Sequence, residues 1–283
     1  MRELIQLTKP TITLWILLTG ATGFITGSRG QLDGWKLLAA LVGLGLMASG
    51  TAALNQWLER DVDKLMRRTA GRPLPAGRLQ PWLAVTWGLF LAGLGFWMLL
   101  ALSRPMAAYL GLFTLASYLL IYTPLKRRTP WSTTAGAVPG AMPPLIGYTS
   151  ATGSIGWEGV LLALVLFLWQ FPHFHSIAWI YREDYARGGI RMKPVVVRDL
   201  RVTAREMLVT SLLLVPASLL LAAQPALDWI YLAGALGGAG LMIWASWSAL
   251  CSPTRQRAKR VLVASLVYLP VFCAFVGLDW WLR

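Results

Sequence analysis

The chain has 283 residues, of which 56% are hydrophobic and only 13% are charged, and its formal net charge is +14 at pH 7. Soluble domains carry about 25% charged residues, so the composition excludes an ordinary soluble enzyme and indicates a lipid environment. The positive charge does not indicate nucleic-acid binding, which needs a basic face on a soluble domain. Here the basic residues lie in short connections between apolar runs.

About nine apolar runs are long enough to cross a hydrocarbon core of about 30 Å, which takes a helix of about 20 residues. They predict an all-α, polytopic membrane protein that forms a single transmembrane domain over residues 1–283. In chain order the runs cover 10–28, 36–58, 82–102, 105–123, 133–151, 157–181, 207–223, 227–249 and 261–281.

The basic residues are distributed unevenly between the two sides that these spans define. If the N-terminus is cytoplasmic, 22 of the 26 Lys and Arg residues fall on the cytoplasmic side. Cytoplasmic loops of membrane proteins collect Lys and Arg, so the bias predicts a cytoplasmic N-terminus and an outside C-terminus. It also favours an odd number of spans.

Polar residues that could hold a metal ion follow the second span. Asn55, Glu59 and Asp63 are spaced i, i+4, i+8 and share one helical face within about 80°, whereas Asp61 points elsewhere. Carboxylates near a helix C-terminus are unfavourable next to the negative end of the helix dipole, so a cation should compensate. Either nearby arginines form an ordinary ion-paired helix end, or these hard oxygen ligands bind magnesium together with substrate phosphates.

Two loops on the predicted cytoplasmic side mix acids, bases and glycine. The first, 64–78, contains Arg67 and Arg72, and arginine forks match phosphate oxygens. The second, 181–193, contains Glu183 and Asp184 and could converge with the first over one cavity. For the basic residues alone, a role in membrane topology is the simpler interpretation.

These residues resemble the UbiA superfamily of intramembrane prenyltransferases. The pattern Asn55-x3-Glu59-x3-Asp63, followed by Arg-Arg-Thr and Arg72-Pro-x-Pro-x-Gly, is similar to the superfamily's first aspartate-rich motif. Glu59 stands where the superfamily usually has Asp, and the spaced aspartates of its second motif are reduced to Glu183 and Asp184, which puts a second magnesium in doubt. Further stretches are similar to the branch that farnesylates heme: 122–127, 140–147, 169–174 and 184–185.

The resemblance implies an enzyme that transfers a farnesyl group from farnesyl diphosphate to a vinyl group of heme B, with addition of water, giving heme O. It further implies Mg2+ as cofactor, a site in the cell inner membrane that faces the cytoplasm, and possible handover of product to heme A synthase or a terminal oxidase assembly pathway. The residues expected for magnesium are Asn55, Glu59, Asp63 and Asp184, and those for the diphosphate are Arg67, Arg72, Lys126 and Arg127.

The only two histidines, His173 and His175, lie within the sixth span. An imidazole could ligate heme iron or hydrogen-bond a propionate, so His173 is also a candidate catalytic residue. The alternative, a histidine satisfied by a neighbouring helix, is equally open for His173 and is favoured for His175.

Three other functions remain open from the sequence. The same chemistry could act on another acceptor, such as a quinone precursor or a chlorophyll-type tetrapyrrole. A transporter would place polar residues at the bilayer midplane, whereas most acids here lie at one membrane edge. A structural membrane subunit would leave the spacing of the acids unexplained.

Overall fold

The computed structural model describes residues 1–224 and 227–282, and within them the chain is helical with no β-strand. Nine helical stretches of at least 19 residues occur in this described part. They are α2 (Pro10–Ser28), α3 (Gly34–Asp63), α4 (Pro81–Met98) continued by the π-helical η1 (Leu99–Ser103), α5 (Pro105–Ala116) continued by η2 (Ser117–Tyr122) and α6 (Thr123–Leu125), α7 (Ser132–Thr152), α8 (Trp157–Ile180), α11 (Leu200–Ala222), α12 (Trp229–Cys251) and α13 (Arg255–Trp281).

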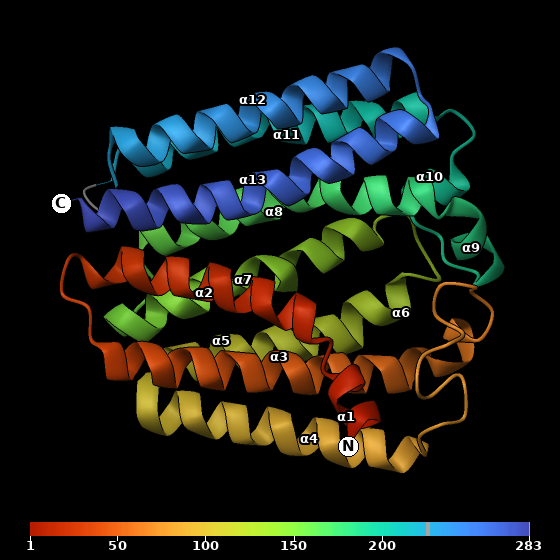
Figure 1. Ribbon diagram of the computed structural model, residues 1–283, viewed down its shortest axis with the longest axis horizontal. Helices are drawn as coiled ribbons and strands as arrows, with labels where there is room; N and C mark the ends of the chain where they lie inside the picture. Colours follow the sequence, from red (N-terminus) through yellow and green to blue (C-terminus); the bar gives the residue numbers. More distant parts are fainter. Residues whose placement is uncertain (225–226, 283) are drawn as a thin grey trace.

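The long helices lie side by side with their axes roughly aligned (Figure 1). On one side, α3 packs against α4 and α2 packs against α7, while on the other side α8, α11, α12 and α13 pack together. The largest core cluster joins α7 and α8 to the last three helices. Short helices α1 (Arg2–Leu7), α9 (Arg182–Arg187) and α10 (Lys193–Val196) connect or precede the long ones.

Eight of the long helices are both long enough and apolar enough to cross a membrane. The prediction of a polytopic all-α membrane protein is therefore confirmed. The remaining long helix, α7, forms where the span 133–151 was expected but is less apolar and carries three prolines within it. A ninth span thus stays a prediction, as does the orientation of the termini.

Helix α7 lies inside the bundle, and most of its residues are buried. Its small residues permit close approach to α2: a Cβ at Gly23 would lie 1.9 Å from the carbonyl oxygen of Pro144, and one at Gly147 would lie 1.8 Å from that of Gly20. Small residues at helix interfaces allow such backbone contact in membrane proteins. Because neighbouring helices surround α7, it does not need a uniformly apolar surface.

Several helices extend beyond the apolar runs that predicted them. Helix α3 continues to Asp63, and α11 begins at Leu200 instead of near residue 207. The side chain of Asp199 accepts the backbone N–H of Arg201 and so caps α11, and Thr254 caps α13 in the same way. Hydropathy locates only the part of a helix that meets lipid, whereas capping side chains determine where it begins.

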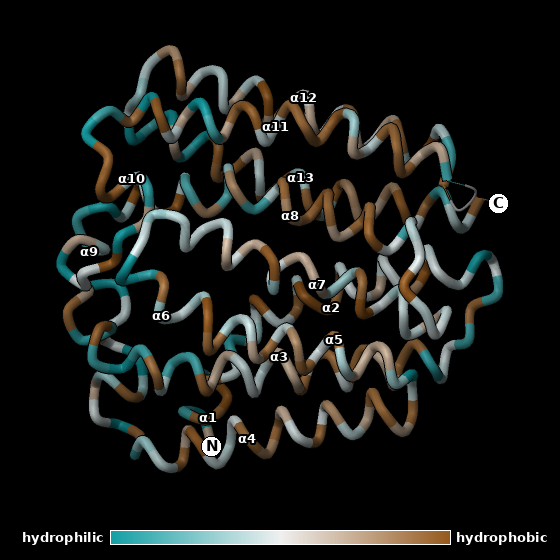
Figure 2. Tube along the Cα trace, turned by 180° about the vertical axis from the view of Figure 1, so that it is seen from behind, coloured by the Kyte–Doolittle hydropathy of each residue, from teal (hydrophilic) through white to brown (hydrophobic). Residues whose placement is uncertain are grey.

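The connections at one end of the bundle gather most of the polar chain. The loop after α3, helix α6, and the α9–α10 segment lie together at that end, which is coloured hydrophilic in Figure 2. Helix α1 lies towards the same end, and the described C-terminal end of α13 lies at the opposite one (Figure 1). This polar end carries the candidate site.

Candidate functional site

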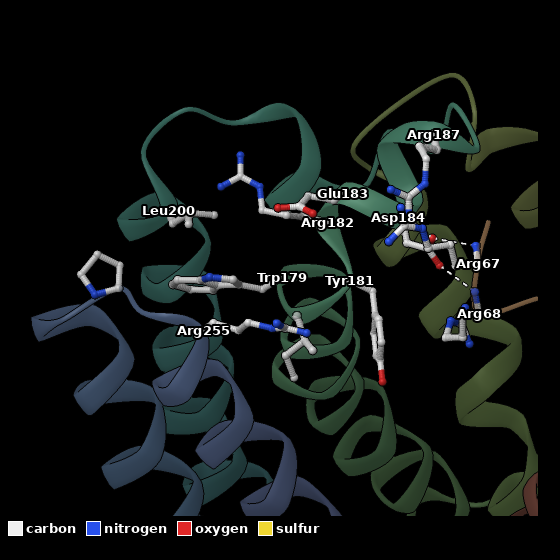
Figure 3. Close-up of a pocket in the computed structure, with 12 residues that line it drawn as sticks. Arg67, Arg68, Trp179, Tyr181, Arg182, Glu183, Asp184, Arg187, Leu200 and Arg255 are labelled. Atoms are coloured by element: carbon white, nitrogen blue, oxygen red, sulfur yellow. Dashed lines mark hydrogen bonds and ion pairs between the residues drawn. The ribbon is translucent and has the colours of Figure 1, made fainter. Parts of the chain in front are cut away.

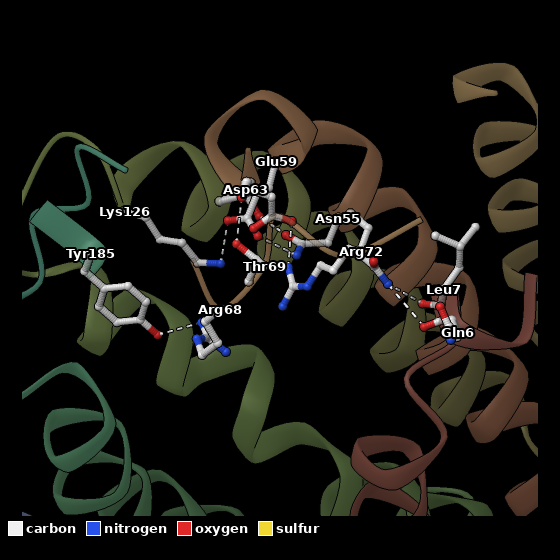
Figure 4. A network of polar contacts seen from close by, with 12 residues as sticks. Gln6, Leu7, Asn55, Glu59, Asp63, Arg68, Thr69, Arg72, Lys126 and Tyr185 are labelled. Atoms are coloured by element: carbon white, nitrogen blue, oxygen red, sulfur yellow. Dashed lines mark hydrogen bonds and ion pairs between the residues drawn. The ribbon is translucent and has the colours of Figure 1, made fainter. Parts of the chain in front are cut away.

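Asn55 and Glu59 form a hydrogen-bonded pair on α3. Two residues from the region of α6, Thr123 and Lys126, also contact this pair. The Asn55 Nδ2 donates to Glu59 Oε2 at 2.8 Å, and the Thr123 hydroxyl donates to Asn55 Oδ1 at 2.9 Å. The Lys126 ammonium lies 2.7 Å from Glu59 Oε1. Figure 4 shows the side chains of Asn55, Glu59 and Lys126 pointing towards one another. Because α3 is continuous through Asp63, residues 55, 59 and 63 lie on one face of the helix, as their spacing i, i+4, i+8 predicted.

Asp63, one turn further along α3, is 1% exposed and is paired with the loop that follows it. Its Oδ2 accepts a hydrogen bond from Arg72 Nη1 at 2.6 Å, while the Thr69 hydroxyl donates to the Asp63 backbone carbonyl at 2.9 Å. Arg72 thereby folds back over the end of the helix (Figure 4). Asp61 is exposed and pairs with Lys64 and Arg60, as its helical angle predicted.

The compensating cations expected beside these carboxylates are therefore Lys126 and Arg72. Burial by itself would lower the pKa of Lys126, but the charge of Glu59 and its hydrogen bond raise the pKa well above its ordinary value. The Lys126 ammonium also lies 4.3 Å from the centroid of the Tyr122 ring and 5.7 Å from that of Tyr118. The surroundings of Lys126 therefore favour its charged form.

Lys9 is a further site residue that the sequence did not single out. It precedes α2 in a left-handed conformation with φ of 48°. Loss of solvent around its ammonium group and the nearby charge of Arg72 lower the pKa of Lys9 to about 8, although Glu59 acts in the opposite direction. From the sequence Lys9 looked like one more topology charge, because no local pattern links it to α3.

An apolar cavity of about 150 Å³ opens beneath these charges. Lys9 and Tyr118 lie among its lining residues, next to the polar site. Helices α2, α3, α5 and α7 supply its remaining walls, in which Thr13, Thr51 and Thr114 are the polar residues. The other wall residues are apolar: Ile12, Ile16, Leu44, Met47, Ala48, Ala52, Gly111, Pro139, Gly140, Pro143 and Ile146. The arrangement suits an amphiphile with an anionic head and a hydrocarbon tail.

Asp184 fastens the two polar loops together. Its Oδ1 and Oδ2 accept the backbone N–H groups of Arg67 and Arg68 at 2.8 and 3.1 Å, and Arg187 forms an ion pair with it (Figure 3). Burial would raise the pKa of Asp184, but the Arg187 guanidinium and the two backbone donors lower it below its ordinary value. The loops do converge, with Asp184 holding the first loop's backbone.

The candidate diphosphate residues divide into two groups. Arg72 and Lys126 lie at the carboxylates of α3. Arg67 instead lines a separate hollow with Asp184, and Arg127 is exposed. The structure therefore brings Asn55, Glu59, Arg72 and Lys126 together around α3.

The described residues contain no group of three or more His, Cys, Asp and Glu side chains arranged to hold a metal ion. Magnesium is usually held by one or two carboxylates together with substrate phosphates, so a closed protein cage is not required. The amide and carboxylate oxygens of buried Asn55, half-buried Glu59 and buried Asp63 on one helix face fit that pattern. Lys126 and Arg72 provide the opposite charge for phosphate oxygens.

His173 has a hydrogen-bonding partner on a neighbouring helix. Its Nδ1 lies 2.9 Å from the Ser265 hydroxyl, and its ring stacks on Trp169 with centroids 4.6 Å apart. His175 is 1% exposed, and its Nε2 lies 3.3 Å from a Glu206 carboxylate oxygen. Both environments suit structural histidines, and a role of His173 towards heme stays a prediction.

Comparisons with known proteins find relatives of one name that match nearly the whole chain. A protoheme IX farnesyltransferase of Solibacter usitatus is 48% identical over 292 residues, covering 99% of each chain. Relatives of the same name from Koribacter versatilis and Salinibacter ruber also match nearly the full length, at 42% and 44% identity.

Solved structures share the fold at low sequence identity. A structure described as digeranylgeranylglyceryl phosphate synthase matches with a TM-score of 0.82 at 16% identity, covering 99% of this chain and 98% of that one. A UbiA homolog from Archaeoglobus fulgidus, bound to GPP and Mg2+, matches with a TM-score of 0.66 at 16% identity, covering 97% and 99%. The family model for UbiA prenyltransferases matches residues 14–278. On this evidence the chain belongs to the UbiA prenyltransferase family.

Proposed function

We propose that the chain transfers the farnesyl group of farnesyl diphosphate to a vinyl group of heme B, with addition of water, and so makes heme O. The observation that carries the proposal is the 48% identity to a protoheme IX farnesyltransferase over 99% of both chains. The apolar cavity beneath a cluster of carboxylates and cations supports it, because a prenyl diphosphate needs both environments.

Asn55, Glu59 and Asp63 would hold magnesium, which supplies positive charge against the departing diphosphate. The UbiA homolog bound to GPP and Mg2+ supports this assignment. Arg72 and Lys126 bind the phosphate oxygens, and Lys9 contributes a further cation. Asp184 acts on the same site through the loop backbone that it fastens.

The reaction needs preorganised positive charge where negative charge develops on the leaving group. Arg72 and Lys126 stabilise the diphosphate as the allylic C–O bond breaks and the bonding electron pair leaves with oxygen. The vinyl group of the porphyrin then forms a carbon–carbon bond to the allylic cation, and water captures the resulting cation with loss of a proton. The product carries a hydroxyethylfarnesyl group.

The cavity walls protect this chemistry from early hydrolysis. An allylic cation must meet the vinyl carbon before it meets water, and the mostly apolar wall below the site offers few groups that would hold water there. The ring of Tyr118, which lines the cavity next to Lys126, offers a π face to positive charge. These two features favour transfer to carbon over release of farnesol.

The proposal includes a nine-span domain over residues 1–283 with its N-terminus in the cytoplasm of a cell inner membrane. The polar end of the bundle then faces the cytoplasm. Product would pass to heme A synthase or to terminal oxidase assembly.

Incubation of the purified protein with heme B, farnesyl diphosphate and magnesium tests the proposal. We expect the mass of a farnesylated, hydrated porphyrin, and we expect none when a chelator is present. Parallel reactions with a quinone precursor and a chlorophyll-type tetrapyrrole distinguish the acceptors. Transfer to one of these but not to heme B would contradict the proposed acceptor.

A further inference from the structure

A second hollow opens at the polar end, apart from the carboxylates of α3. Its volume is about 650 Å³. The loop after α3, the end of α8 with α9, the start of α11 and the turn before α13 enclose it (Figure 3). None of the residues lining the apolar cavity beneath the diphosphate site lines this hollow.

The hollow is strongly cationic. Five arginines line it against two carboxylates, an excess of three positive charges: Arg67, Arg68, Arg182, Arg187 and Arg255 against Glu183 and Asp184. Asp184 is already paired with Arg187. In the described part of the chain, no carboxylate forms an ion pair with Arg182 or Arg255. These two guanidiniums remain available to an anionic ligand.

Aromatic side chains line the hollow together with the arginines. Trp179 and Tyr181 both line the hollow, and Figure 3 shows Trp179 next to Arg255. The Arg68 guanidinium lies 5.5 Å from the centroid of the Tyr181 ring. Membrane topology explains basic residues at this end, but it does not require that they converge with aromatic rings on one hollow. The combination suits an anion attached to a large flat apolar body.

The farnesyl diphosphate does not account for this hollow. Its fifteen-carbon tail needs an apolar cavity continuous with its phosphates, and that cavity adjoins Lys9 and Tyr118 at the other site. The two places are nonetheless neighbours in the chain, since Arg67 follows Asp63 by four residues. Asp184 holds this connecting segment by its backbone, so a ligand seated in the hollow is placed at a fixed position relative to the end of α3.

From these observations we infer that Arg182 and Arg255 bind the propionate carboxylates of the tetrapyrrole acceptor. The inference rests on the proposed function, which gives the acceptor two carboxylates and a reactive vinyl group. Carboxylates are costly to place in hydrocarbon, so they must stay at the polar end while the vinyl edge reaches the allylic carbon. Guanidiniums pair with carboxylates in a bidentate geometry, which orients the porphyrin as well as holding it.

The test compares heme B with its dimethyl ester, which lacks the propionate charges. Replacement of Arg182 or Arg255 by Gln should raise the KM for heme B about tenfold, the usual effect of losing one charge-assisted contact. The KM for farnesyl diphosphate and the KM for the dimethyl ester should stay unchanged. Arg205→Gln removes an exposed charge from α11 outside the hollow and serves as the matched control.

A heme titration followed by absorbance, without farnesyl diphosphate, separates this inference from the proposed function. If the wild-type protein binds heme B through these arginines but forms no farnesylated porphyrin, the propionate site is supported and the proposed reaction is refuted. Equal losses for heme B and its dimethyl ester would overturn the inference, as would a raised KM for farnesyl diphosphate alone. An effect seen only in vesicles that contain anionic lipid would assign the hollow to lipid headgroups instead.

Discussion

The pair formed by Asp63 and Arg72 allows the metal-site hypothesis to be separated from a simple ion-paired helix end. Asp63 is 1% exposed, and its carboxylate lies 2.6 Å from the guanidinium. We predict that Asp63→Asn lowers turnover about a thousandfold, since a lost metal ligand removes about 4 kcal/mol of charge stabilisation in the transition state. Arg72→Met should instead raise the KM for farnesyl diphosphate.

The double variant decides between the two interpretations. Removing one partner of a buried ion pair destabilises a protein by about 3–5 kcal/mol, and replacing both partners relieves much of that cost. Thermal unfolding in detergent should therefore show that Asp63→Asn combined with Arg72→Met is more stable than either single variant. Its turnover in the heme farnesylation assay should stay as low as that of Asp63→Asn. Turnover that recovers together with stability would refute a metal role for Asp63.

Four further outcomes are expected. Removal of divalent ions with a chelator should abolish turnover, and added magnesium should restore it while the melting temperature stays nearly constant. Because the pKa of Lys9 lies near 8, its positive charge is lost as pH rises through about 8, and kcat/KM for farnesyl diphosphate should fall there. Lys9→Arg keeps the charge and should remove this fall at alkaline pH from the pH profile. Ala48→Phe should fill the apolar cavity and raise the KM for farnesyl diphosphate more than that for geranyl diphosphate. Glu158→Gln should lower the free energy of unfolding by about 1–3 kcal/mol and leave the KM values unchanged. Glu158 is buried at the end of α8 opposite the candidate site and accepts a hydrogen bond from Tyr148. A changed KM would show coupling between the two ends of the bundle.

Local periodicity accounts for the part of the site that the sequence predicted. Asn55, Glu59 and Asp63 share a face because helix geometry depends only on their spacing. The opposite placement of Asp61 follows from the same rule, and its exposure confirms it. Apolar run length likewise located every long helix, since lipid imposes a minimum length on a span.

The remaining features depend on contacts between distant segments, which spacing does not encode. Lys9 reaches the site from the start of α2, and Lys126 reaches it from beyond α6. A magnesium role for Asp184 stays a prediction, and no local pattern indicated that its oxygens accept backbone N–H groups from a loop more than a hundred residues earlier. The separation of the arginines into two sites has the same origin.

The composition of α7 bears on how the protein is assembled. A helix interrupted by three prolines and rich in small residues gains little free energy by entering lipid alone, because each partly polar turn would meet hydrocarbon. Helices α2 and α8 pack against it and cover much of its surface. If α7 forms the predicted ninth span, it must enter the membrane together with these neighbours, so that insertion and tertiary folding become one step for this segment.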